Sequence, residues 1–277
     1  MKTKITVTNI ILLMFFTTIF YGQTQKYGDL DYNKAINVSG KQRMLSQKMA
    51  KAYLLMSQGI ENEKLKKELN SSKFIFEKQL EILKNNASSS STKLYLKEVS
   101  KIWRDYKKII NESAGKTNAL KILSLNTDLL KNCHQVVLSI ERTSNYNNKF
   151  FENNDQELIN TINVSGKQRM LSQRMCLYFT AIKSFPENKS EYKDVLKVVF
   201  DEFSDVIGDL LISTFNTTEI EEEIGVIMAL WEQYQSRKSK FVDGDFELIN
   251  VYNVTNDLTK SFNKITGLYE LVASKRK

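Results

Sequence analysis

The chain has 277 residues, of which 42% are hydrophobic and 26% charged, and it contains a single proline, Pro186. This composition excludes a disordered chain and favours a folded, mainly helical protein. The formal net charge of +8 is spread along the sequence and is not interleaved with aromatic residues, which excludes the usual surface of a nucleic-acid-binding protein.

The first 22 residues have the layout of a secretory signal. Lys2 and Lys4 precede an apolar run that ends at Phe20, and a positive start followed by an apolar stretch is typical of such signals. A run of about a dozen residues is short for a membrane-spanning helix, which needs about twenty. We therefore predict a signal peptide over residues 1–22 and an exported chain, periplasmic or secreted. An uncleaved membrane anchor is the alternative.

One short stretch occurs twice almost unchanged. NVSGKQRMLSQKM at residues 37–49 returns as NVSGKQRMLSQRM at residues 163–175, and the single difference, Lys48 against Arg174, keeps the positive charge. Other landmarks recur in the same order, such as Trp-x-x-Tyr at residues 103–106 and 231–234. The sequence therefore predicts a duplicated domain, with a first copy over 24–150 and a second over 151–277.

Hydrophobic periodicity predicts four helices in each copy. In the first copy they lie near 30–58, 60–86, 92–113 and 117–148. In the second they lie near 153–184, 188–214, 217–240 and 244–274. Short polar loops between helices of this length indicate antiparallel neighbours. We expect an all-α fold of two tandem antiparallel four-helix bundles related by an internal pseudo-two-fold, in a monomeric pseudo-dimer.

The asparagine-rich junction at residues 144–155 is either a tight reversal or part of one long helix. Cys133 and Cys176 lie on either side of it. They would be about 64 Å apart on a continuous helix, whereas a reversal would bring them to the same level. An exported protein permits a disulfide between them. The alternative is two unrelated buried cysteines.

On a helix the repeated stretch presents two stripes of residues. The first suits packing within its own bundle and consists of Ala35, Val38, Leu45, Met49 and Ala52. The second stripe has small and apolar residues around one arginine, and consists of Ile36, Gly40, Arg43, Gln47, Ala50 and Leu54. Its counterpart in the second copy contains Ile162, Gly166, Arg169, Gln173 and Cys176.

Two such faces laid together would bring Arg43 and Arg169 close to each other. At about 6 Å two guanidinium groups repel by roughly 3 kcal/mol, while an anion about 4 Å from each gains roughly 4 kcal/mol per contact. The pair therefore favours a planar oxyanion that accepts forked hydrogen bonds. Lys48 and Arg174 lie too far around the helix to touch the same ligand. Four serines border the face and could donate hydrogen bonds: Ser39, Ser46, Ser165 and Ser172.

The pattern I-N-x-x-G-x-x-R-M-L-S-Q-[KR]-M resembles the signature of the PilJ/NarX-type sensor domain, found in nitrate/nitrite sensor kinases and in type IV pilus chemotaxis transducers. The resemblance implies four-helix bundles that pair through their first helices, with the motif arginine binding nitrate across a two-fold axis. That role would fall on Arg43 and Arg169, with the backbones of Gly40 and Gly166 beside the ligand. The sequence GKQRMLSQ resembles the pilus transducers more closely than the nitrate/nitrite sensor kinases.

Other residues indicate packing rather than chemistry. The motif methionines suit helical cores, and a single histidine, His134, cannot build a histidine-rich metal site. We therefore expect no metal, no cofactor and no enzymatic activity. The sequence predicts a sensor-like protein that binds a small inorganic oxyanion and signals through a separate partner, such as a membrane receptor. The alternative is a structural or adaptor module that keeps the helix-pairing face without a ligand.

Overall fold

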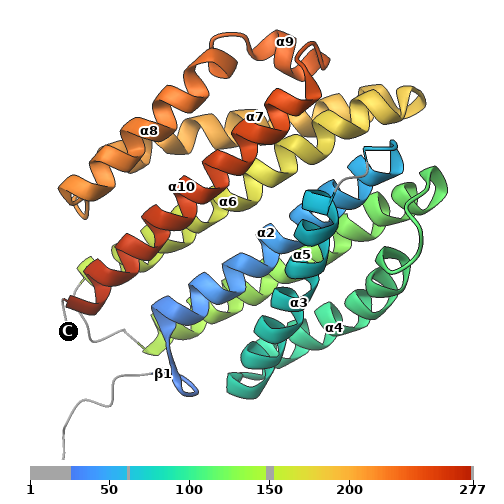
Figure 1. Cartoon of the computed structure of the whole chain (residues 1–277). Helices are drawn as coiled ribbons and strands as arrows, with labels where there is room; N and C mark the ends of the chain where they lie inside the picture. Colours follow the sequence, from blue (N-terminus) through green and yellow to red (C-terminus); the bar gives the residue numbers. More distant parts are fainter. Residues whose placement is uncertain (1–25, 61–62, 148–152, 276–277) are drawn as a thin grey trace, which may run out of the picture.

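The computed structural model describes residues 26–60, 63–147 and 153–275, and within these ranges it is almost entirely α-helical (Figure 1). The all-α class predicted from the sequence is confirmed. The proposed signal peptide lies outside the described residues. A short antiparallel hairpin that the helical periodicity did not predict, β1 (Lys26–Tyr27) paired with β2 (Leu30–Asp31), leads directly into the first helix.

The first group of helices agrees closely with the predicted ranges. It comprises α2 (Tyr32–Ser57), α3 (Glu63–Asn86), α4 (Ser90–Ile110) and α5 (Lys116–Asn147). Helix α2 ends because Gly59 takes a left-handed conformation, with φ of 75°, which closes the last turn. Helix α4 begins where the Ser89 side chain accepts a hydrogen bond from the Thr92 amide.

The second group follows the same plan with one extra break. It comprises α6 (Asn153–Ser184), the 3-10 turn η1 (Pro186–Asn188), α7 (Lys189–Leu211), α8 (Thr218–Gln235), α9 (Lys238–Asp243) and α10 (Leu248–Lys275). The segment predicted as one helix near 217–240 is two helices, α8 and α9. Each group is filled by a buried tryptophan beside a buried tyrosine, Trp103 with Tyr106 and Trp231 with Tyr234.

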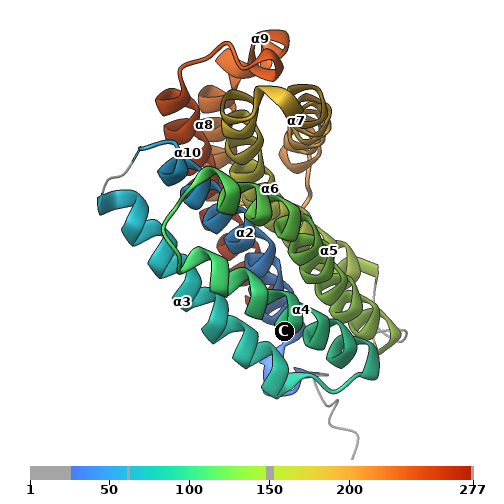
Figure 2. The same cartoon turned by 90° about the vertical axis from the view of Figure 1, so that its right-hand side faces the viewer.

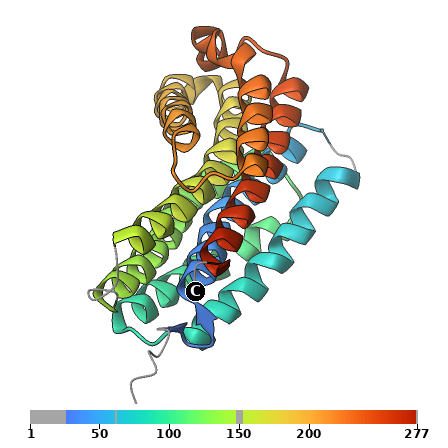
Figure 3. The same cartoon turned by 90° about the vertical axis from the view of Figure 1, so that its left-hand side faces the viewer.

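Helices α2 and α6 form the seam between the two groups. In the first group α2 contacts α3 and α5, in the second α6 contacts α7 and α10, and α2 and α6 contact each other along their length. Figures 2 and 3 show the two groups on either side of this seam. Because α2 has neighbours on several sides, both of its predicted stripes are buried, except for Val38, which is partly buried. None of the helices in the described ranges combines the length and apolar character needed to cross a membrane.

The chain reverses between α5 and α6. Asn163 Nδ2 of α6 donates a hydrogen bond to Glu141 Oε1 of α5 over 2.9 Å, whereas one continuous helix would separate these residues by about 33 Å. The reversal predicted as one alternative is therefore confirmed. The linking residues 148–152 are outside the described ranges.

The two cysteines are buried and free, so the disulfide that the sequence permits is not formed. Cys133 lies beside Arg43, and Cys176 lies beside Lys51. These two positions on α2 are about 12 Å apart along the helix axis, too far for disulfide geometry. The chain reverses at a point that is nearer to Cys133 than to Cys176 in the sequence. The two thiols therefore lie at different heights along the paired helices.

Candidate functional site: a buried arginine pair between α2 and α6

Arg43 of α2 and Arg169 of α6 approach each other across the seam, and both side chains are buried. A Cβ atom placed on Gly40 would lie 3.4 Å from Arg43 Nη2 and 3.5 Å from Arg169 Nη2. The two guanidinium groups therefore border the same point in space. At Gly166 a Cβ atom would lie only 2.8 Å from Arg169 Nη2. The two motif glycines leave the room that the arginines occupy.

The contacts of Arg43 are nearly complete. Arg43 Nη2 donates to Asn163 Oδ1 over 2.8 Å, and Arg43 Nη1 donates to His134 Nδ1 over 3.2 Å. This second bond requires a neutral histidine ring with its proton on Nε2. Asn163 in turn donates to Glu141 over 2.9 Å. Only Arg43 Nε lacks a partner among the described residues. We call Arg43, His134, Asn163 and Glu141 the first half-site.

Arg169 has equivalent surroundings but fewer contacts. Arg169 Nη1 donates to Asn263 Oδ1 over 3.1 Å, and Arg169 Nε donates to the Gly166 carbonyl over 3.2 Å. Asn37 Nδ2 donates to Glu270 Oε2 over 2.6 Å. Arg169 Nη2 and Asn37 Oδ1 are buried, and neither has a hydrogen-bond partner in the described part of the chain. We call Arg169, Asn263, Asn37 and Glu270 the second half-site.

The residues that surround the arginines were not predicted to belong to the site, and His134 was expected to have no role in binding. The two asparagines open the two copies of the repeated stretch, and the histidine, the asparagine of α10 and the two glutamates come from the last helix of each group. His134 and Asn263 are 129 positions apart, and so are Glu141 and Glu270. The stretches LNTDL at residues 125–129 and VTNDL at residues 254–258 recur at this same offset, so aligning the last helices of the two copies could have revealed these pairs.

The charges of the arginines are not neutralised directly. No described carboxylate forms an ion pair with either arginine, because Asn163 stands between Arg43 and Glu141. Burial lowers the pKa of Arg43 to about 10. Burial and the charge of Arg43 lower the pKa of Arg169 to about 9. Both guanidinium groups remain charged at neutral pH, and their mutual repulsion favours an anion at this position.

Four serines predicted as ligand donors have another role. Each hydroxyl donates its proton to a carbonyl of its own helix, as serines within helices often do. The pairs are Ser39 with Ile36, Ser46 with Arg43, Ser165 with Ile162 and Ser172 with Gln168, at 2.8 to 3.1 Å. All four hydroxyls are therefore engaged within their own helices, and a role for them in binding a ligand stays a prediction.

The second basic residue of each motif points away from the arginine pair, as expected. Arg174 Nη1 donates to Gln47 Oε1 over 3.2 Å, and its guanidinium lies 4.8 Å from the centre of the Tyr178 ring. Burial lowers the pKa of Lys48, and the negative charge of Glu68 partly offsets this fall. Neither residue joins Arg43 and Arg169.

A second polar layer lies further along the seam and was not predicted. The buried Lys51 Nζ is 2.6 Å from Glu68 Oε1 and donates to Asn256 Oδ1 over 2.8 Å. Tyr252 OH of α10 donates to Glu68 Oε2 over 2.8 Å. These bonds join α3 of the first group to α10 of the second. At the position of Lys51 the second copy has Leu177.

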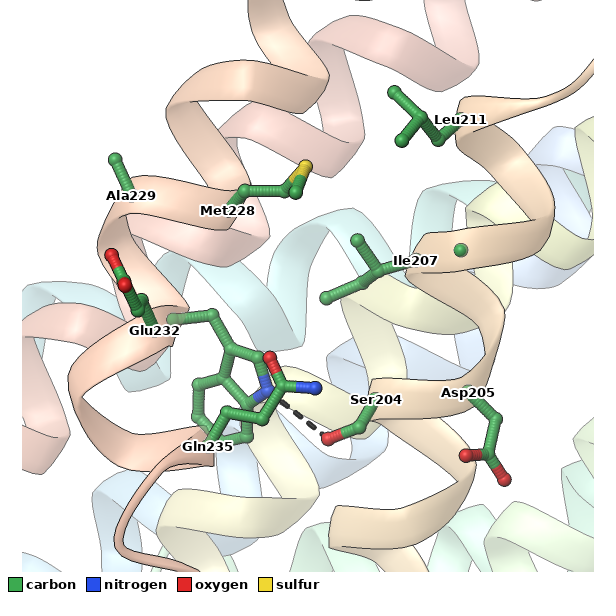
Figure 4. A pocket seen from close by; sticks show the side chains of 10 residues that line it. Ser204, Asp205, Ile207, Leu211, Met228, Ala229, Glu232 and Gln235 are labelled. Carbon is green, nitrogen blue, oxygen red and sulfur yellow. Dashed lines mark hydrogen bonds between the residues drawn. The ribbon is translucent and has the colours of Figure 1, made fainter.

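A pocket of about 570 Å³ opens between α7 and α8 (Figure 4). Ile207 and Leu211 line one wall and Met228 the other, with Asp205 and Glu232 among the lining residues. Ser204 accepts a hydrogen bond from Trp231 Nε1 over 3.1 Å. The residues that line this pocket include no cation, so it does not suit an anion.

Comparison with known families gives one match. Residues 30–127 match the family model described as the type IV pili methyl-accepting chemotaxis transducer N-term, PilJ. This is a family of signal-transduction domains rather than of enzymes, and the matched range includes Arg43 and the first copy of the repeated stretch. Comparison with curated proteins gives no significant match, and comparison with solved structures gives none either.

Proposed function

We propose, from the PilJ sensor domain that residues 30–127 carry, that this protein is an exported sensory binding protein for a small oxyanion. We interpret the two groups of helices as two four-helix bundles related by a pseudo-two-fold axis that passes between Arg43 and Arg169. One anion would bind on this axis. The chain would then hold within itself the kind of site that the family resemblance places between two subunits.

The observation that carries this proposal is the meeting of two buried guanidinium groups at Gly40, neither of which forms an ion pair with a described carboxylate. A buried charge is costly unless a partner of opposite charge compensates it. Arginine also favours planar oxyanions because its donors form a rigid fork. A trigonal oxyanion between the arginines would relieve their repulsion and take up the donor on Arg169 that has no described partner.

Signalling would follow from the place of the site on the seam. The arginines lie on the helix of each group that contacts the other group. An anion that binds one relative position of α2 and α6 better than another shifts the population toward that position. We propose that a separate partner, such as a membrane receptor, reads this shift.

The rival is a structural or adaptor module in which the arginines only hold the helices together. Direct ion pairs from Glu141 and Glu270 to the arginines would favour it. The structure instead places Asn163 between Arg43 and Glu141, and Asn37 holds Glu270 at 2.6 Å. This arrangement supports the binding hypothesis, because the carboxylates orient the asparagines without occupying the space between the guanidinium groups.

Calorimetry on residues 23–277 with nitrate and nitrite tests the proposal. We expect binding that Arg43→Ala and Arg169→Ala together abolish, with far-ultraviolet circular dichroism as the check that the variant is folded. If neither these anions nor another small oxyanion such as hydrogencarbonate raises the unfolding temperature or releases heat, or if the double variant binds as well as the original chain, the rival is correct.

A variant that keeps every charge makes the test sharper. Gly40→Ala would place a methyl group between the arginines at 3.4 and 3.5 Å from their nitrogens, and alanine is the better helix former. We expect this variant to stay folded and to lose anion binding. Gly267→Ala in α10 is the matched control, because nothing lies within 4 Å of its added methyl group, and we expect it to bind as before.

A further inference from the structure

We infer that the ligand of the arginine pair is an oxyanion that keeps one O–H group, with hydrogencarbonate as its simplest example. This inference rests on the proposed function and concerns the kind of anion. The carrying observation is that an acceptor, Asn37 Oδ1, and a donor, Arg169 Nη2, are both buried in the second half-site without a hydrogen-bond partner among the described residues.

The orientation of the Asn37 amide is fixed by its neighbour. Asn37 Nδ2 donates to Glu270 Oε2 over 2.6 Å, and a carboxylate oxygen accepts only from the nitrogen side of an amide. The oxygen of Asn37 is therefore the acceptor that remains. Burial raises the pKa of Glu270, although the bond from Asn37 opposes the rise.

The unpaired donor and acceptor are neighbours. Arg169 Nη2 lies 3.5 Å from the position of a Cβ on Gly40, and Asn37 is three residues before Gly40, on the same face of α2. In the first half-site the equivalent atoms, Arg43 Nη2 and Asn163 Oδ1, meet at 2.8 Å. In the second half-site the corresponding atoms, Arg169 Nη2 and Asn37 Oδ1, bond neither to each other nor to another described residue, and we infer from this equivalence that a ligand can bridge them.

The donor and acceptor together select among anions. Nitrate can only accept hydrogen bonds, so it would satisfy Arg169 but would leave the oxygen of Asn37 buried opposite another oxygen. Hydrogencarbonate has the same planar shape and charge and carries one O–H that can donate to Asn37. A site built around such a donor rejects the analogue that lacks it, since its buried acceptor is then left unpaired. We expect a preference of roughly tenfold to a hundredfold.

The test is competition calorimetry on the original chain with hydrogencarbonate, nitrate and acetate at slightly alkaline pH. Acetate replaces the O–H of hydrogencarbonate with a methyl group. We expect hydrogencarbonate to bind at least about tenfold more tightly than either of the others. Equal binding, or tighter binding of nitrate or acetate, would overturn this inference and leave the proposed function standing. Failure of all three to bind would overturn both.

Two matched variants locate the effect. Asn37→Leu removes the unpaired acceptor, and we expect the ratio of hydrogencarbonate to nitrate affinity to fall to about one. Asn132→Leu removes an amide of α5 that lies outside both half-sites and donates to the Asp128 carbonyl, and we expect the ratio to stay as in the original chain. An unchanged ratio in Asn37→Leu, or an equal fall in both variants, would contradict the role of Asn37.

Discussion

The first and second half-sites begin from the same thirteen residues and reach different states. In the first, Arg43 bonds to Asn163 at 2.8 Å and to His134 at 3.2 Å. In the second, Arg169 Nη2 and its counterpart acceptor on Asn37 have no described partner. The repeated stretch fixes where the arginines lie, but its asparagine oxygen bonds to an arginine only in the first half-site, where His134 from outside the stretch adds a second contact.

The same contrast continues along the seam. Beyond the arginines the first copy has Lys51 and the second has Leu177, and only the lysine requires a buried carboxylate. Glu68 supplies it from α3, and Tyr252 extends the contact to α10. The layer around the two arginines is therefore formed by identical stretches, whereas the layer around Lys51 is formed by residues that differ between the two copies. A nearly symmetric pair of arginines thus lies in asymmetric surroundings, so the ligand that we propose would bind in one orientation.

The largest expected effect comes from removing the buried carboxylate of the Lys51 layer, which the second copy does not need. Glu68→Leu leaves a buried ammonium without its carboxylate, so the free energy of unfolding should fall by about 3–5 kcal/mol. Urea denaturation measures this loss. Lys51→Leu together with Glu68→Leu removes both charges and should recover most of it.

The control for that variant is an exposed pair, Lys260 with Asp257 at 2.7 Å. Asp257→Asn should lower the free energy of unfolding by less than about 1 kcal/mol. A cost for Glu68→Leu no greater than this would show that the Lys51 layer does not hold the two groups together.

The two motif glycines provide a smaller contrast. At Gly166 an added Cβ would lie 2.8 Å from Arg169 Nη2, and we expect Gly166→Ala to lower the free energy of unfolding by about 1–3 kcal/mol. At Gly40 the nearest distances, 3.4 and 3.5 Å, are van der Waals contacts. Gly40→Ala should keep or raise stability, by up to about 1 kcal/mol. Equal effects in chemical denaturation would contradict this difference in space.

His134 gives the first half-site a pH dependence that the second lacks. Burial lowers its pKa to about 4, and the positive charges of Arg43 and Lys167 add to this shift. The negative charge of Glu202 partly opposes it. An unfolded histidine has a pKa of about 6.5, so the unfolded chain binds more protons between these values. Stability should therefore fall as the pH falls from about 6.5 toward 4.

Asn263 occupies the equivalent position in the second half-site, and His134→Asn tests the effect by copying it. The variant can still accept the bond from Arg43, and we expect a shallower loss of stability in thermal unfolding over that pH range. A curve parallel to that of the original chain would show that His134 does not titrate in this way.

The smallest expected effect concerns the thiols. Burial raises the pKa of Cys133 to about 12, although Arg43 opposes the rise, so the thiol stays protonated and unreactive. A reductant should leave the unfolding temperature unchanged. A thiol reagent should label both cysteines only after denaturation. A fall in the unfolding temperature with reductant would instead show that Cys133 and Cys176 form a disulfide.

The helices and the arginine pair were predictable because both follow from helical periodicity within one segment. The helical period placed Arg43 and Gly40 on a face of the helix separate from the packing stripe. The second copy of the stretch supplied the equivalent face with Arg169. The contacts of His134 and Asn163 were not predictable in this way, because they depend on the register between helices. Lys51 was missed because a single charge on an apolar face carries no sign of its partner, which comes from a different helix.

The stoichiometry of anion binding, measured by calorimetry with hydrogencarbonate at known concentrations of the original chain, tests the central claim most directly. If Arg43 and Arg169 share one ligand within a single chain, one anion should bind per chain, and either Arg43→Ala or Arg169→Ala alone should remove it. Half an anion per chain would place the site between two molecules. Two anions per chain, or none, would contradict a shared arginine pair.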